Sequence, residues 1–229
     1  MCRDALGAHR GPMNTSRNTL AVSGLLAGLL PLVGNGLYDG GEGSGTEVLA
    51  LAEQGLPPIA WVAYPLELIG FGALCVLLGS LVAMLWNRAP VAAATTGIVG
   101  AAMVSVKIGS IAPGMALREH YEGVSPATAE VFSAIGDAAF VVSGLLLSAA
   151  MTVAGVGLLQ IDFPRWLSWW AVVAGGAGVL AGLVGVLAPA AYFPIPFLLL
   201  LVWMIALGLS TALSTNVGKP VGAAIAVPE

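Results

Sequence analysis

Three ionisable side chains interrupt long stretches of this sequence that otherwise consist mainly of apolar and small residues. They are Glu67, Lys107 and Asp137. An ionised side chain inside the hydrocarbon of a bilayer costs about 2.5–3.5 kcal/mol even on the scale that gives the lowest values. Such residues usually pair with one another or mark a path for protons or ions. Their relative positions therefore decide what chemistry this chain can do.

Counting along the expected helices brings these three groups to a similar depth. Glu67 lies about nine residues into the second expected helix, Asp137 about eleven residues into the fourth, and Lys107 about six residues before the outer end of the third. At 1.5 Å per residue, all three would lie roughly 9–17 Å below the outer surface. We expect one intramembrane cluster in which Lys107 pairs with Asp137, with Glu67 or with both. Glu130 lies nearer the outer surface, at the expected mouth of the cluster.

This expected cluster has two interpretations. As a structural element, Lys107 is a buried ion-pair partner that keeps three helices in register. As a functional element, two carboxylates that share one lysine leave a net charge of about -1, so that one carboxylate can take up a proton or a cation. A further possibility removes Glu67 from the cluster. If Pro65 begins the second helix, Glu67 lies in the first turn, stabilised by the positive helix end.

The composition identifies the class of protein in which these stretches occur. Of the 229 residues, 58% are hydrophobic and only 9% are charged, and the mean hydropathy is +0.95. An ordinary soluble domain has about 25% charged residues, so the few acids and bases present here cannot cover a soluble surface. The net charge of -4 and the lack of a basic stripe exclude a nucleic-acid-binding protein. The expected partner is the lipid bilayer.

Six apolar stretches are each long enough to cross about 30 Å of hydrocarbon as a helix. They are continuously apolar, whereas the strands of an outer-membrane barrel alternate between apolar and polar residues. We therefore expect an all-α, six-span helix bundle. The expected spans are residues 18–38, 58–86, 90–113, 126–158, 167–187 and 193–213. They form a transmembrane domain over residues 17–214, after a disordered cytoplasmic leader (1–16) and before a cytoplasmic tail (215–229).

The basic residues indicate the orientation, because cytoplasmic loops carry an excess of lysine and arginine. If the N-terminus is cytoplasmic, the basic residues inside are Arg3, Arg10, Arg17, Arg88, Arg165 and Lys219. Only Arg118 then falls outside, where the loops carry several acidic residues. An even number of spans returns the C-terminus to the cytoplasm. The pattern predicts both termini inside, in a bacterial cytoplasmic membrane. Met13 is a plausible alternative start to Met1.

Two local patterns predict helix starts in the outer loops. Ser44 and Glu47 have capping-box spacing, which predicts a short helix over residues 47–54 of the first outer loop. Ser125 followed by Pro126 is typical of an N-cap and a first helical position, and it predicts the start of the fourth span.

Small residues recur at four-residue spacing in two of the expected spans. Gly24 and Gly28 do so in the first, and Ala174, Gly178 and Gly182 in the fifth. Helices associate in lipid where small residues let backbones approach closely. The favoured interpretation is a tight bundle within one chain. The alternative is a homo-oligomer that forms through these faces.

No arrangement of residues points to catalysis, to a metal or to a cofactor. His120 is the only histidine in the outer loop that also holds Glu119 and Glu122, and one histidine in an acidic loop is weak grounds for a metal site. The serines within the spans have no histidine placed to activate them. The sequence also lacks a P-loop and the HExxH zinc motif. We expect no catalytic residues, no metal and no cofactor.

The turn before the fifth expected span carries a short motif. It reads Asp162-Phe163-Pro164-Arg165-Trp166-Leu167. With six spans, a basic leader and an acidic first outer loop, this motif resembles a family of uncharacterised six-helix bacterial integral membrane proteins with a Pro-Arg-x-Leu-Gly-type turn at this place. Ser168 stands where that family has glycine. The composition, rich in alanine and glycine and poor in lysine, is similar to that of actinobacterial proteins. The resemblance implies no activity and no catalytic residue.

These observations lead to two main hypotheses about function, and a third, a membrane enzyme, would need a polar pocket that converges on His120. The first is a non-enzymatic membrane protein, structural or accessory, in which the charge cluster holds helices together. The alternative is a small proton- or cation-coupled carrier that uses the same cluster. A dry, fully paired cluster would favour the first hypothesis, and a water-reachable cavity that ends at the cluster would favour the second.

Overall fold

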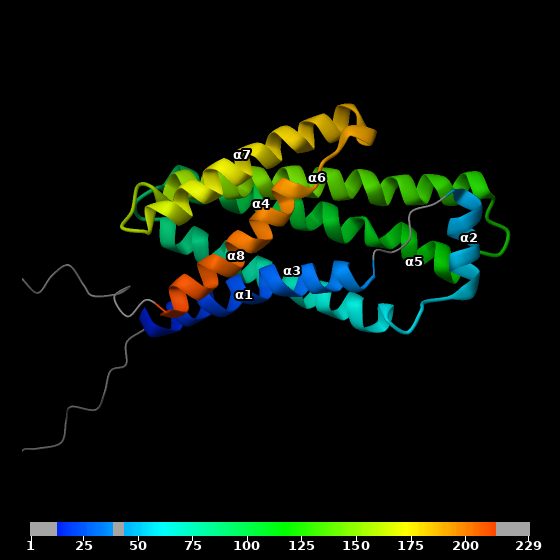
Figure 1. Ribbon diagram of the computed structural model, residues 1–229, viewed down its shortest axis with the longest axis horizontal. Coiled ribbons are helices and arrows are strands. Elements are labelled where there is room, and N and C mark those ends of the chain that lie inside the picture. The colour runs from blue at the N-terminus through cyan, green and yellow to red at the C-terminus, as the bar shows by residue number, and fades with distance from the viewer. Residues whose placement is uncertain (1–12, 39–43, 214–229) are drawn as a thin grey trace, which may run out of the picture.

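The computed structural model describes residues 13–38 and 44–213, a part of the chain that is helical and contains no β-strand (Figure 1). The elements are α1 (Met13–Leu37), α2 (Gly45–Gln54), α3 (Ala60–Leu85), α4 (Pro90–Gly109), α5 (Ile111–Glu119), α6 (Pro126–Leu158), α7 (Arg165–Leu187), the 3-10 turn η1 (Pro189–Ala191) and α8 (Ile195–Leu213). The expected tail (215–229) and the first twelve residues of the expected leader lie outside the described residues, as do Asp39, Glu42 and Lys219. α1 already begins at Met13, inside the segment expected to be a disordered leader.

Six helical segments of the described chain are long and apolar enough to cross a membrane. They are Arg17–Leu37, Ala60–Leu85, Pro90–Glu119, Pro126–Leu158, Arg165–Leu187 and Ile195–Leu213. The expected all-α fold with six candidate spans is confirmed at this level. The third span is longer than expected, because α5 continues α4 after a break at Ser110. Pro113 explains the break, since its nitrogen cannot donate to the carbonyl of Gly109.

The contacts divide the six long helices into two groups of three, which lie one above the other in Figure 1. In the first helix group, α1 packs most extensively against α3 and α8, and in the second helix group α6 packs against α4 and α7. Contacts between the groups run chiefly through α3 with α4 and through α7 with α8. Across the second of these seams, the buried indole N–H of Trp203 donates to the carbonyl of Leu167 at 2.7 Å.

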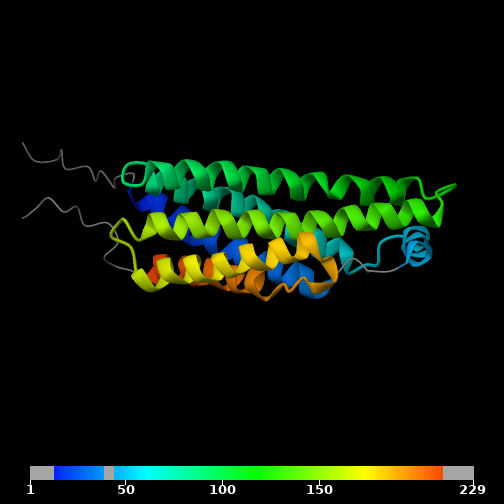
Figure 2. The same ribbon diagram turned by 90° about the horizontal axis from the view of Figure 1, so that it is seen from above.

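The second helix group extends beyond the first at one end. α6 has 33 residues, which gives a length of about 50 Å, compared with about 30 Å of hydrocarbon. Its first turns project past the end of α7 together with α5, and α2 lies across them (Figures 1 and 2). Ala52, Leu117 and Ala129, one residue each from α2, α5 and α6, form a small buried cluster there. We call this end of the molecule, which the orientation predicted above would place outside, the outer cap.

The two predicted helix starts of the outer loops are confirmed. Ser44 and Glu47 form a capping box at the start of α2, in which the Ser44 N–H donates to Glu47 Oε2 at 2.7 Å. This hydrogen bond to the ionised carboxylate lowers the pKa of Glu47. At the start of α6, Ser125 Oγ accepts from the N–H of Thr128 at 3.2 Å.

Small residues bring neighbouring helices into backbone contact within the chain. Gly24 and Gly28 of α1 lie against α8, and a Cβ atom on Gly28 would lie 2.6 Å from the carbonyl oxygen of Leu201. On α7, a Cβ atom on Gly182 would lie 3.0 Å from the Cα atom of Leu145 on α6, and Gly178 lies against the side chain of Ser148 on α6. Neighbouring helices of the same chain thus fill both faces, as the tight-bundle interpretation expects.

The first and last helices meet at the end of the bundle opposite the outer cap. Arg17 of α1 donates from Nε to the carbonyl of Thr211 at 2.9 Å and from Nη2 to that of Ala212 at 3.0 Å. Both carbonyls belong to the last turn of α8, where the final carbonyls lack partners within the helix. The Arg17 guanidinium therefore caps α8 and complements the negative end of its dipole.

We expect Gly28→Ala to destabilise the protein, because the new methyl group would meet the backbone of α8. Overpacking of this kind costs about 1–3 kcal/mol. Gly36→Ala is the matched control in the same helix, since nothing lies within 4 Å of a Cβ atom at that position. The free energy of unfolding in mixed micelles measures both changes. Equal effects at the two positions would contradict the backbone contact between α1 and α8.

Candidate functional site

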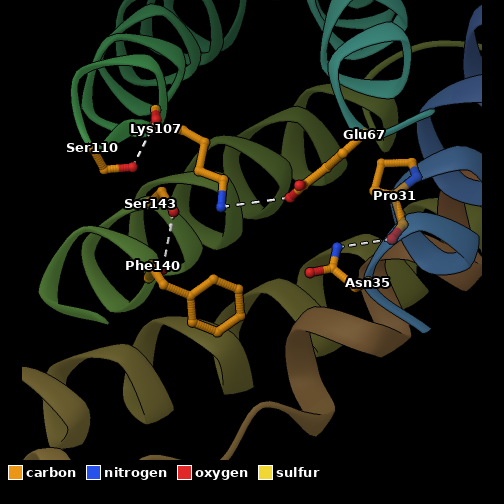
Figure 3. Close-up of polar contacts among 7 residues, drawn as sticks. All are labelled: Pro31, Asn35, Glu67, Lys107, Ser110, Phe140 and Ser143. Atoms are coloured by element: carbon orange, nitrogen blue, oxygen red, sulfur yellow. Dashed lines mark hydrogen bonds and ion pairs between the residues drawn. The ribbon is translucent and has the colours of Figure 1, made fainter. Parts of the chain in front are cut away.

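An ion pair joins the two helix groups near the outer cap. Lys107 Nζ of α4 lies 3.6 Å from Glu67 Oε1 of α3, and about one fifth of each side chain is exposed (20% and 21%) (Figure 3). α3 belongs to the first helix group and α4 to the second, so the pair bridges the seam between them. One of the pairings expected for Lys107 is therefore present.

The local packing of α3 explains the position of Glu67. The helix begins at Ala60 and contains Pro65 in its interior, so Glu67 does not lie in the first turn. Gly34 of α1 lies against this part of α3, where a Cβ atom would lie 3.4 Å from the Glu67 nitrogen. The close approach of α1 supports the α3 backbone next to the ion pair.

Two aromatic rings complete the surroundings of the Lys107 ammonium group. Its Nζ lies 5.5 Å from the ring centre of Phe71 on α3 and 5.5 Å from that of Phe140 on α6. Both distances are within the range in which a cation is attracted to an aromatic ring face. Lys107 therefore contacts α3 through a carboxylate and a ring, and α6 through a second ring. The sequence offered one sign of this arrangement, because Phe71 follows Glu67 by one helical turn.

Asp137 and Glu130 do not join the ion pair. Both are exposed residues of α6, and no ion pair to either occurs among the described residues. Asp137 is less than one helical turn from Phe140, whose ring contacts Lys107, so it lies at a similar level along α6. Its side chain is exposed on another face of the helix and does not point to the lysine. The expected cluster of three charges is therefore corrected to a pair.

A narrow cavity lies between the two helix groups beneath the ion pair. Its polar lining consists of Asn35, Glu67, Lys107 and Ser143, and its other walls are apolar or aromatic. The amide of Asn35 donates to the Pro31 carbonyl at 2.8 Å, so its nitrogen is already bonded within α1 (Figure 3). The space open to water centres is about 20 Å³, which is room for about one water molecule.

A second cationic contact lies outward from the ion pair. Arg118 Nη2 of α5 donates to the Tyr64 hydroxyl of α3 at 2.7 Å, and its guanidinium carbon lies 5.3 Å from the Tyr64 ring centre. Tyr38 at the end of α1 packs edge-to-face on the same ring at 5.8 Å. The sequence pattern did not predict this contact, because Arg118 was placed in a loop. Two cations of the α4–α5 segment thus hold the same helix, α3.

Within the described ranges, no three His, Cys, Asp or Glu side chains lie close enough together to hold a metal ion. His120 is exposed at the end of α5. The chemical capacity of the site is therefore that of one amine, one carboxylate and the neighbouring amide and hydroxyl groups.

No family model matches the sequence, and comparisons with curated proteins and with solved structures found no match either.

We expect Lys107→Met and Glu67→Gln to destabilise the protein singly, because each leaves an uncompensated partner in an apolar region. The cost should be about 2–3 kcal/mol each, below the ~3–5 kcal/mol of a fully buried pair because both side chains are partly exposed. The double variant should recover at least half of the summed loss, and the free energy of unfolding in mixed micelles measures this coupling.

Asp137→Asn is the control for this cycle, since it removes an exposed carboxylate from the neighbouring helix. Its effect should stay within about 0.5 kcal/mol. Strictly additive losses in the double variant, or a loss from Asp137→Asn as large as that from Lys107→Met, would refute the pairing.

Proposed function

We propose that this chain is a non-enzymatic membrane protein, structural or accessory, in which the Lys107–Glu67 pair couples the two helix groups. The observation that carries this proposal is the environment of the Lys107 ammonium group. One carboxylate and two aromatic rings face it, from two neighbouring helices. A cation whose protein partners come from both sides of a seam holds that seam together, and this role needs no ligand.

The small size of the cavity supports the same proposal. It has room for about one water molecule, which is less than the water-reachable cavity that would favour a carrier. An intramembrane charge that is retained despite its cost can specify which helices pair and in what register.

We also propose that both termini face the cytoplasm of a bacterial cell. Arg17, Arg88 and Arg165 belong to the end of the bundle opposite the outer cap, in agreement with the excess of cationic residues in cytoplasmic loops. The resemblance of the turn at Pro164 to bacterial six-helix proteins supports the same assignment. A homo-oligomer would use surfaces other than the glycine faces of α1 and α7, because these are filled within the chain.

Cysteine labelling tests this orientation in a chain whose own cysteines are replaced by serine. An impermeant maleimide should label Gln54→Cys of the outer cap in intact cells. Asn87→Cys, in the turn between α3 and α4, should be labelled only after lysis. The reverse pattern would refute the orientation.

A small proton- or cation-coupled carrier is the second candidate function. The cavity favours it, because it lies between two helix groups and contains an ionisable pair. Transporters place their sites at such seams, and one group then moves against the other. The Lys107–Glu67 and Arg118–Tyr64 contacts would both have to separate for the cavity to open outward.

Flux measurements in proteoliposomes distinguish the two candidates. With a pH-sensitive dye inside, we expect the wild-type protein to dissipate an imposed proton gradient no faster than protein-free liposomes do, and with a sodium-sensitive dye we expect the same for a sodium gradient. A second measurement, the amount of protein that accumulates in the cell, tests the structural role. The charge-swapped double variant Lys107→Glu/Glu67→Lys should accumulate to a higher level than Lys107→Glu or Glu67→Lys alone, because it restores an ion pair. Flux through the wild-type protein that Glu67→Gln abolishes and Asp137→Asn retains would instead establish the carrier.

A further inference from the structure

A groove on the lipid-facing surface of α7 lies away from the ion pair. Trp166, Trp169, Val173 and Ala177 line it on α7, and Leu199 closes it on α8. The hollow is shallow and open to the surroundings, with a volume of about 430 Å³, and the small residues Ala174 and Ala177 lie in it among large neighbours. Trp169 is 55% and Val173 66% exposed, so no described part of the chain covers the groove.

The location of the groove limits what can fill it. α7 is one of the six candidate spans, so its free face meets hydrocarbon in a bilayer. The walls between Val173 and Leu199 are apolar and suit an acyl chain. This inference rests on insertion into a membrane and does not depend on the role of the Lys107–Glu67 pair.

One end of the groove carries groups that suit a phospholipid headgroup. Arg165 is the first residue of α7, next to Trp166 and one helical turn from Trp169. Its side chain is exposed and makes no ion pair with a described acidic residue. The indoles of Trp166 and Trp169 are also exposed, and each offers one N–H donor. A cation and two donors at the end of an apolar groove complement an anionic headgroup with its acyl chain.

A second copy of the chain fits this face less well. Two copies with the same membrane orientation that meet through α7 would be related by an axis along the membrane normal. Such an axis places identical ends together, so Arg165 of one copy would approach Arg165 of the other. Repulsion between the two guanidinium groups opposes that contact.

We propose that the α7 groove binds one anionic phospholipid, with its acyl chain over Ala177 and its phosphate at Arg165. The cation should concentrate anionic lipid at this site over zwitterionic lipid of the same chain length. A single cationic side chain near the membrane surface gives about a fivefold preference.

Quenching of tryptophan fluorescence by brominated acyl chains tests the proposal. The full chain with Trp61→Phe and Trp86→Phe retains the groove indoles and the buried Trp203 as an internal reference. The protein is reconstituted in two series of bilayers that contain the same proportions of phosphatidylglycerol and phosphatidylcholine. In the first series the phosphatidylglycerol is brominated in increasing amounts, and in the second series the phosphatidylcholine is. We expect half-maximal quenching at an about fivefold lower mole fraction of the brominated phosphatidylglycerol.

Two pairs of variants test whether the lipid preference and the quenching arise at the α7 groove. Arg165→Gln should abolish the preference for phosphatidylglycerol, whereas Arg88→Gln, a cation at the same end of the bundle, should retain it. Ala177→Phe fills the hollow and should weaken quenching by both lipids, whereas Ala83→Phe on the exposed face of α3 should not.

Three results would overturn the proposal. The first is equal quenching by both lipids in the chain with Arg165 intact. The second is a preference that persists in Arg165→Gln. The third is that neither lipid quenches the indoles of the groove and that the reconstituted chain is a dimer. This result would show that a second copy covers the groove.

Discussion

Lipid gives helices no hydrophobic drive to associate, because acyl chains are as apolar as the side chains that face them. This bundle depends instead on close backbone contact, which its glycines permit. Gly28 lets α1 reach α8, and Gly182 lets α7 reach α6. These contacts build each helix group internally. The seam between the groups has longer side chains, and there an ion pair and two aromatic rings fill the space that backbone contact leaves open.

The spans could be predicted from the sequence because hydrocarbon thickness sets the length of an apolar helix. The outer cap could not, because hydropathy does not distinguish a helix in lipid from one that protein partly covers. The first turns of α6, around Ala129, pack beside α2 and α5. Arg118 was assigned to a loop although it belongs to the last turn of α5.

The candidate site could be predicted only in part. Counting residues brought Glu67 and Lys107 to a similar depth, which the ion pair requires. Depth does not say which way a helix is rotated about its axis, however, and that rotation decides which carboxylate meets the lysine. For α3, packing against α1 near Gly34 contributes to this choice. The contact between Lys107 and Phe140 depends on how α4 and α6 pack, and no local pattern in the sequence encodes it.

The capping of α8 by Arg17 has a consequence for synthesis in the cell. The two partners are 194 residues apart in the chain, and ribosomes add about 5–20 residues per second. The first helix therefore waits on the order of 10–40 s for the last one. During that interval α1 has α3 as its partner, while Gly24 and Gly28 face lipid or the insertion machinery. A chain that stops before α8 lacks the helix that covers Gly24 and Gly28 in the complete bundle.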